Sequence, residues 1–218
     1  MPVASNTFTL DDMIQGFFEH KIVEINIKNP FLLASGRTSP VYLDHRKIFS
    51  HPKLRTGVLQ LWSRTLLSYL PPNCDPSTVA IVGTATAGIA PAFGLSTLWN
   101  CAFAYVRSQS KGHGLKNTIE GVIPAGAPVI VVEDMVTTGG SVLKACNDVR
   151  AAGGNLLFAT CISQHRRTET DVLFIENKLS LVNLIKTDLL FEGAQRMNII
   201  STEEAQVVAR WLAELQAS

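Results

Sequence analysis

The stretch Val129–Ser141 constrains the fold more than any other part of the chain. It begins with an unbroken run of β-branched apolar residues, a pattern typical of a parallel strand buried on both faces. Glu133 and Asp134 follow, then the small residues Thr137–Ser141, and then apolar residues at helical spacing. A strand, a turn of small residues and a helix N-terminus together suit a phosphate group. The two acids beside the turn indicate that this phosphate belongs to a sugar whose hydroxyls need binding.

A glycine-rich turn can also serve backbone geometry alone, because such turns are common between the strands and helices of α/β folds. The stretch is neither a Walker loop, which needs Gly-x-x-x-x-Gly-Lys-Ser/Thr, nor a dinucleotide fingerprint, which needs Gly-x-Gly-x-x-Gly. The whole string, and not its glycines alone, therefore favours a phosphate site.

A second loop of tiny residues follows the apolar run Val79–Val82. Its residues are Gly83, Thr84, Ala85, Thr86, Ala87 and Gly88, and a helical pattern starts at Ile89. The loop could simply permit tight packing, or it could hold an anion at the start of a helix. Both loops follow strands of the same predicted sheet. We therefore expect them at its carboxyl edge, where open α/β sheets bind ligands.

Apolar runs separated by helical patterns define the fold class. Further buried strands are predicted at Ala102–Val106, Leu156–Ile162 and Leu181–Ile185, with a short strand within Ile22–Ile27. Helix starts are predicted at Thr9-x-x-Asp12, His51-Pro52, Thr168-x-x-Asp171 and Ser201-x-x-Glu204. The pattern predicts an α/β fold with a doubly wound, mainly parallel, five-stranded sheet.

Two segments do not suit core elements. Residues 108–121 have no hydrophobic period, but they contain Lys111 and His113 on either side of a glycine, which favours a functional lid over a surface excursion. Phe31–Arg46 combines a Gly-Arg turn, a Ser-Pro break and a polar end. It is either a surface hairpin or the rim of a site.

Composition excludes several classes of protein. A formal net charge of +1, with no basic run, gives no reason to expect nucleic acid. Residues 76–106 carry no charge, but glycines and prolines interrupt them, so we expect no membrane span. The four cysteines are far apart and no secretory signal is evident in residues 1–6, so reduced thiols in a cytoplasmic protein are expected. His113 and His165 lack the spacing of zinc ligands.

Four stretches in this order resemble the orotate phosphoribosyltransferases, which are type I phosphoribosyltransferases. They are Leu33–Pro40, Gly83–Ile89, Tyr105–Gly114 and Val131–Ser141. The resemblance implies the type I phosphoribosyltransferase fold as a single domain over residues 1–218. That domain would have a small N-terminal hood at about 1–45, a core at about 46–190 and a C-terminal helix at about 201–216.

The resemblance also implies the reaction and its residues. Mg²⁺-dependent transfer of ribose 5-phosphate from phosphoribosyl diphosphate (PRPP) to N1 of orotate would give orotidine 5′-monophosphate and pyrophosphate. The implied catalytic residues are Lys111, His113 and Asp134. The implied PRPP-binding residues are Thr84, Ala85, Thr86, Ala87, Gly88, Arg107, Lys111, His113, Glu133, Asp134, Met135, Val136, Thr137, Thr138, Gly139, Gly140 and Ser141. The implied neighbours of orotate are Phe31, Ala34, Thr137 and Arg166, with Arg167 nearly as well placed. Mg²⁺ would be held mainly by PRPP, with Glu133 or Asp134 as a contact. A homodimer is implied, with lid residues 108–121 shared between subunits.

The chain departs from this pattern at Ala34, Ala87 and Ser108, where many members of the family carry lysine. One unit charge about 4 Å from an anion contributes up to roughly 4 kcal/mol at an effective dielectric constant of about 20. The remaining cations would therefore have to contribute more. Two alternatives stay open, a PRPP-binding regulatory protein of the same fold and a phosphoribosyltransferase for another base.

Overall fold

The centre of the structure is a six-stranded sheet in the order β10-β9-β8-β5-β6-β7. The computed structural model describes residues 7–33, 36–108, 118–165 and 167–217. The strands are β5 (Ala80–Thr84), β6 (Ala102–Val106), β7 (Ile119–Gly121), β8 (Pro128–Val136), β9 (Asn155–Gln164) and β10 (Leu181–Lys186). All neighbouring pairs are parallel except β6 and β7. The five parallel strands confirm the predicted fold class, and β7 adds an antiparallel edge strand that the sequence did not indicate.

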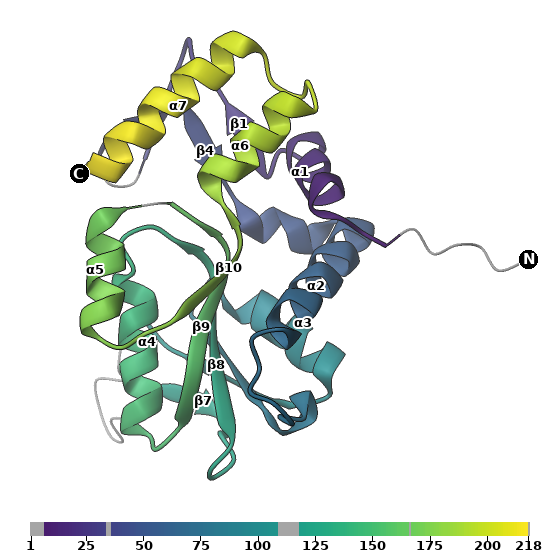
Figure 1. Cartoon of the computed structure of the whole chain (residues 1–218), viewed down its shortest axis with the longest axis vertical. Coiled ribbons are helices and arrows are strands. Elements are labelled where there is room, and N and C mark those ends of the chain that lie inside the picture. The colour runs from purple at the N-terminus through teal and green to yellow at the C-terminus, as the bar shows by residue number, and fades with distance from the viewer. Residues whose placement is uncertain (1–6, 34–35, 109–117, 166, 218) are drawn as a thin grey trace, which may run out of the picture.

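Helices cover both faces of this sheet (Figure 1). They are α2 (Pro52–Leu67) and α3 (Ile89–Trp99) on one face and α4 (Gly140–Ala151) and α5 (Thr168–Glu176) on the other. The side chains of β8 alternate between two cores, because Ile130 and Val132 belong to one cluster and Val129 and Val131 to the other. A run of β-branched residues is therefore buried on both faces, as a central parallel strand requires.

The N-terminal and C-terminal segments of the described chain pack together above the carboxyl edge of the sheet (Figure 1). The N-terminal part contributes α1 (Leu10–Glu19) and two small antiparallel pairs. These pairs join β1 (Val23–Ile25) to β4 (Val41–Leu43) and β2 (Phe31–Leu32) to β3 (Thr38–Ser39). The C-terminal part contributes α6 (Thr187–Arg196) and α7 (Thr202–Ala217). We call this layer the hood. It is thus built from both ends of the chain, whereas the sequence placed only residues 1–45 there.

Side-chain caps fix two of the predicted helix starts. Thr9 and Asp12 form a reciprocal capping box at α1, and Ser201 and Glu204 form the same bonds before α7. The helix start predicted at Thr168 is confirmed, but Thr168 is the first residue of α5 and not its cap; the N-cap is Arg167, which makes no side-chain capping bond. Helix α6 was not predicted at all. Short 3-10 helices at His45–Ser50 and Pro76–Thr78 complete the elements of the described chain. Within the described residues, no helix combines the length and apolarity needed to cross a bilayer.

Candidate active site

The two loops of small residues lie side by side at the carboxyl edge of the sheet. Strands β5 and β8 are parallel neighbours, with Gly83 in register with Val132, and Thr84, Ala85 and Ser141 from the two loops line one small cavity. The Thr84 hydroxyl donates to the Val132 carbonyl at 3.2 Å. A Cβ added at Gly88 would lie only 2.4 Å from that same carbonyl oxygen and from Thr84 Oγ1. Glycine at position 88 therefore allows the first loop to lie against the strand that carries the second.

The second loop forms a small cup at the start of α4. A hollow of about 50 Å³ is lined by Glu133 and by residues 135–142. Gly139, at φ +79°, is the N-cap of α4 and supplies no side-chain acceptor, so the first-turn N–H groups have no side-chain cap. Uncapped amides at a helix N-terminus attract anions. We call residues 137–141 the phosphate loop.

The acid pair lies within β8 and not at its end. The sequence suggested that the strand stops at these acids so that both could line one site, but β8 continues to Val136. Strand alternation directs the two side chains toward opposite faces, but the carboxyl groups remain close enough for Asp134 to help raise the pKa of Glu133. Glu133 is buried beside the phosphate loop, and its Oε1 accepts from the Asp134 amide at 3.0 Å. Asp134 lies within electrostatic reach of His45, under the hood.

A cavity of about 570 Å³ separates the phosphate loop from the hood. This volume is within the range of about 300–1,000 Å³ that is usual for small-molecule sites. Its lining residues are Leu33, Arg37, Thr38, Ser39, Val41, Tyr42 and Leu43 from the hood strands, Met135, Thr137 and Thr138 from the end of β8, His165 and Arg167 after β9, and Trp211 and Leu215 from α7. Among these described residues two are arginines and none is acidic, so the cavity suits a ligand that carries an anionic group.

A smaller cavity of about 110 Å³ lies between the first loop, the end of β6 and the start of α4. Thr84, Ala85, Arg107, Ser108 and Lys144 are among its lining residues. Arg107 Nη1 pairs with Glu120 Oε1 at 3.4 Å, and Lys144 Nζ pairs with Asp148 Oδ2 at 2.9 Å. Two cations therefore lie beside the first loop, near the point where the predicted lid leaves β6.

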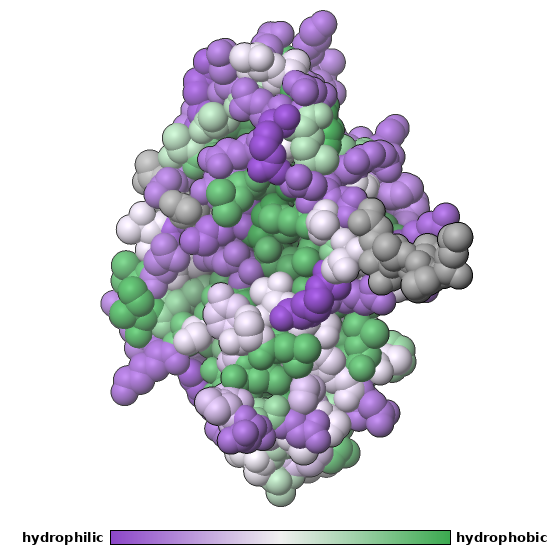
Figure 2. Space-filling view, turned by 45° about the vertical axis from the view of Figure 1, so that its right-hand side comes forward, coloured by the Kyte–Doolittle hydropathy of each residue, from purple (hydrophilic) through white to green (hydrophobic). Residues whose placement is uncertain are grey.

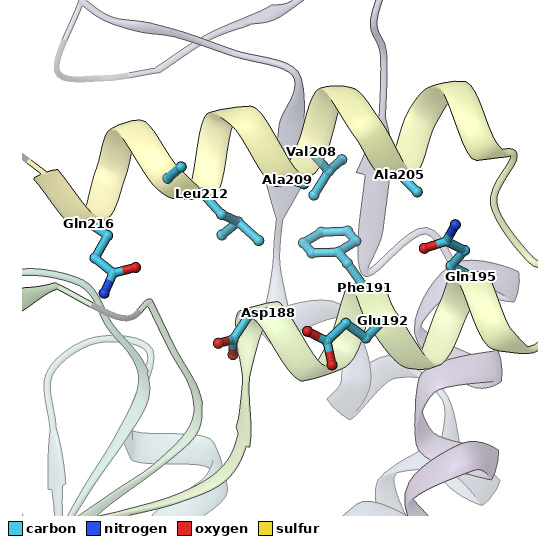
Figure 3. A pocket seen from close by; sticks show the side chains of 10 residues that line it. Asp188, Phe191, Glu192, Gln195, Ala205, Val208, Ala209, Leu212 and Gln216 are labelled. Atoms are coloured by element: carbon cyan, nitrogen blue, oxygen red, sulfur yellow. The ribbon is translucent and has the colours of Figure 1, made fainter.

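A further groove lies in the hood, between α6 and α7 (Figure 3). Phe191 of α6 points toward Val208 and Leu212 of α7, and the carboxylates of Asp188 and Glu192 lie along one rim. The described residues that line this groove include no cationic side chain. It therefore does not suit a phosphorylated ligand.

Both loops lie within sequence that this chain shares with known proteins. The family model of the phosphoribosyl transferase domain matches residues 63–179, which include both loops. An orotate phosphoribosyltransferase of Listeria innocua is 36% identical over 193 residues, 88% of this chain and 90% of the relative. That of Porphyromonas gingivalis is 34% identical over the same shares of the two chains.

The chain belongs to the orotate phosphoribosyltransferase family.

Solved structures agree with this placement. The orotate phosphoribosyltransferase of Aeropyrum pernix superposes with a TM-score of 0.70 at 25% identity, over 87% of this chain and 99% of that one. A UMP synthase of Leishmania donovani superposes with a TM-score of 0.77 over 94% of this chain but only 42% of its own. At 21% sequence identity, this superposition shows that the two proteins share a fold. Orotate phosphoribosyltransferases are pentosyltransferases, and the chain is therefore placed among these enzymes.

The orotate phosphoribosyltransferase motifs fall on three parts of one site. The motif around Glu133–Ser141 forms the cup, the motif at Thr84–Gly88 lies beside it, and Arg107 faces the small cavity. Thr137 also lines the large cavity. Phe31 does not line it and instead packs on Tyr42, with ring centroids 5.6 Å apart. The predicted residues Ala34, Lys111, His113 and Arg166 lie outside the described part of the chain.

Several lining residues were not singled out from the sequence, and Arg167, Trp211, Leu215 and Lys144 are among them. Arg167 lines the large cavity with a side chain only 12% exposed. It was named only as an alternative to Arg166. Trp211 and Leu215 belong to the helix whose start was predicted at Ser201, and Lys144 lies in the helix that follows the phosphate loop. No local pattern marks these three side chains, because only the tertiary fold brings them to the site.

Two buried histidines near the site have a pKa below the ordinary value. Burial lowers the pKa of His45 to about 4, against the opposing effect of the Asp134 and Asp44 carboxylates. Burial likewise lowers the pKa of His165 to about 4. His45 Nε2 lies 3.3 Å from Ser163 Oγ. The only sequence signal for His45 was its place in the polar end of Phe31–Arg46.

Glu133→Gln is expected to remove a dependence of folding stability on pH. Burial raises the pKa of Glu133 to about 8 from an ordinary value of 4.5, although the Thr84 hydroxyl and the Asp134 amide oppose the shift. The folded state therefore binds this proton more tightly than the unfolded state does. The resulting stability is full below pH 4.5 and is lost as the pH rises through about 8.

Urea denaturation at intervals from pH 5 to 9 checks this prediction. The free energy of unfolding of the wild type should fall relative to that of Glu133→Gln by at least about 1.4 kcal/mol, which corresponds to one pKa unit. The exposed substitution Glu176→Gln is the control and should follow the wild type. Parallel curves for the wild type and Glu133→Gln would contradict the raised pKa.

Proposed function

We propose that this chain transfers ribose 5-phosphate from PRPP to N1 of orotate, giving orotidine 5′-monophosphate and pyrophosphate in the synthesis of pyrimidine nucleotides. The bond from ribose C1 to the diphosphate oxygen breaks, a bond from C1 to N1 forms, and the N1 proton is released. The observation that carries the proposal is the large acid-free cavity with two arginines, directly beside a cup of uncapped amides. One part suits an anionic planar base and the other suits the sugar phosphate.

The residues would act mainly by positioning and by stabilising charge. The phosphate loop would hold the 5′-phosphate of PRPP, and Glu133 and Asp134 would bind the ribose hydroxyls. Negative charge grows on the departing diphosphate, so donors directed at it stabilise the transition state more than the ground state. Arg107 and Lys144 line the cavity on that side, and Lys144 supplies a cation that the family pattern did not lead us to expect.

The described acids fit a magnesium ion that is held mainly by substrate. Among the described residues no cluster of three or more His, Cys, Asp or Glu side chains could form a protein cage for a metal. Mg²⁺ usually keeps phosphate oxygens and one or two carboxylates as ligands. Glu133 or Asp134 would supply that carboxylate. The bound ion would neutralise part of the diphosphate charge.

A panel of bases tests the proposal. The protein is incubated with PRPP, Mg²⁺ and, in turn, orotate, uracil, adenine or hypoxanthine, and pyrophosphate release is measured. We expect release with orotate alone, because orotate is the only one of these bases that brings a carboxylate to the arginines of the cavity. Release with another base would indicate a different specificity. PRPP binding without turnover of any base would support the regulatory alternative.

We also propose that the chain acts as a cytoplasmic homodimer. Helix α3 exposes Phe93 and Leu98, and Phe93 is 59% accessible although it packs edge-on against Phe103 of β6. Figure 2, which brings the side of α2 and α3 forward, shows apolar surface spread over this face. An exposed apolar surface of this kind indicates an interaction site. This apolar surface adjoins β6, which leads into the predicted lid, so a second subunit here could receive residues 108–121.

The cysteines support the cytoplasmic part of the proposal. All four are unpaired thiols, as expected in a reducing compartment.

Mixing two inactive variants is expected to restore activity. If each lid closes over its partner's site, a dimer of one Lys111→Ala chain and one Asp134→Asn chain has one site with both substitutions and one with neither. An equimolar mixture of exchanging subunits should then recover about one quarter of the wild-type rate. Pyrophosphate release before and after mixing measures this. No recovery in subunits shown to exchange would indicate lids that act within their own chain.

A further inference from the structure

Helix α7 presents one apolar stripe whose two edges contact different parts of the molecule. Val208 and Leu212 point toward α6 and Phe191, where they close the groove between the two helices (Figure 3). Trp211 and Leu215 also lie one turn apart and line the large cavity. Residues three and four apart share one face of a helix, so the four side chains form a single stripe and each pair marks one edge of it. The first edge holds α7 to the hood, and the second edge lies toward the proposed base site.

Trp211 is fixed to the ends of the central strands. Its ring centroid lies 5.4 Å from that of His165, and the two planes meet at 88° in an edge-to-face contact. The backbone N–H of His165 donates to the Val136 carbonyl at 2.9 Å, at the end of the strand that leads into the phosphate loop. The indole therefore has a defined position relative to the phosphate loop.

The position of Trp211 in the chain separates it from the shared phosphoribosyl transferase domain. The family match ends at residue 179, so Trp211 and Leu215 lie outside it, as do the hood residues Arg37–Leu43. Within the match lie the loops that would hold PRPP, the substrate that all phosphoribosyltransferases have in common. The cavity walls from outside the match can therefore add recognition of one particular base to the contacts that Thr137 and Arg167 supply from within it.

We propose that Trp211 is the apolar wall of the base pocket and determines which pyrimidines enter it. This inference rests on the proposed function, because it assigns the large cavity to orotate. The indole contacts a flat anionic ring and leaves no room for bulky ring substituents, while the arginines of the cavity meet the carboxylate.

Steady-state kinetics with Trp211→Ala and Trp211→Phe test the assignment. Trp211→Ala should raise KM for orotate about tenfold, the loss expected for one aromatic contact, and should leave KM for PRPP within about twofold. Trp211→Phe should restore most of the affinity for orotate. Trp211→Ala should also accept orotates with a large substituent on C5 better than the wild type does. An unchanged KM for orotate in Trp211→Ala would overturn the proposal.

The control is Leu212→Ala, at the edge of the same stripe that packs toward α6. It removes packing against α6 and should lower the melting temperature without a selective change in KM for orotate. If Leu212→Ala raises KM for orotate as much as Trp211→Ala does, the effect comes from loosening α7, and the proposed contact is wrong.

Fluorine NMR gives a readout that does not depend on folding of the alanine variant. The chain contains three tryptophans, so protein labelled with 5-fluorotryptophan gives three signals. Trp62 and Trp99 donate to Thr160 and Ser63 within the core and do not line the cavity. Orotidine 5′-monophosphate should shift only the signal that is missing in Trp211→Phe. A Trp211 signal that stays in place at saturation would refute the proposed contact between Trp211 and the base. A wild-type chain that does not turn over orotate would refute the proposed function itself.

Discussion

Replacing Lys111 with alanine is expected to lower kcat with orotate by about 10²–10³-fold, the usual cost of removing one preorganised donor from a developing negative charge. The affinity for PRPP should change much less, because the contact strengthens as the diphosphate departs. Lys111 lies outside the described residues, so the prediction rests on its motif and on the cavity beside Arg107. Steady-state kinetics give kcat, and calorimetric titration without orotate gives Kd for PRPP.

Lys53→Ala is the matched control, because Lys53 is an exposed lysine on α2. It should keep wild-type values of kcat and Kd. If Lys111→Ala instead raises KM for PRPP and leaves kcat unchanged, Lys111 binds ground and transition states equally, and the assigned role is wrong.

Gly88→Ala is expected to destabilise the fold by about 3 kcal/mol or more and to abolish PRPP binding. A Cβ at this position would lie 2.4 Å from the Val132 carbonyl oxygen and 2.8 Å from the Thr84 backbone nitrogen. Backbone atoms of a central strand cannot move aside as a side chain can, so the cost should reach the upper end of about 1–3 kcal/mol for overpacking. A backbone shift that relieved this clash would separate the two loops. Urea denaturation and calorimetric titration with PRPP measure the two effects.

Gly94→Ala, in the same helix, is the control for this effect. Its Cβ would meet only the side-chain ends of Leu59, at 2.7–3.4 Å, and alanine favours the helix by about 1 kcal/mol. It should therefore cost much less stability and leave PRPP binding intact. Equal losses in both variants would show that the close approach of Gly88 to Val132 is not what holds the loops together.

The sequence predicted the elements whose signal is local. Each of the five parallel strands is an apolar run between turn residues, and the capping boxes at Thr9 and Ser201 mark helix starts directly. The edge position of Phe31–Arg46 was also open to prediction, because its mixed composition suits no core element. The structure shows that both interpretations of it hold, since Phe31–Ser39 contains a hairpin and its residues line the large cavity.

Features that depend on contacts between distant segments were not predictable. Strand β7 has only three residues and forms by pairing with β6, and α6 follows β10 without a side-chain cap. The end of β8 was misplaced because polar side chains at a ligand-binding edge resemble a strand end. Trp211 fits a core stripe on α7. Trp211 lies 46 positions after His165 in the sequence, and only the fold, which brings the two rings together, shows that Trp211 lines the cavity.

Calorimetric titration of the wild-type chain with PRPP and Mg²⁺, without orotate, tests the central claim most directly. That claim is that the carboxyl edge of the sheet, between the two loops, holds a phosphorylated sugar. We predict saturable heat at one PRPP per chain, and a loss of that heat in Gly88→Ala protein that remains folded. The absence of heat, or the same binding in folded Gly88→Ala, would contradict the account.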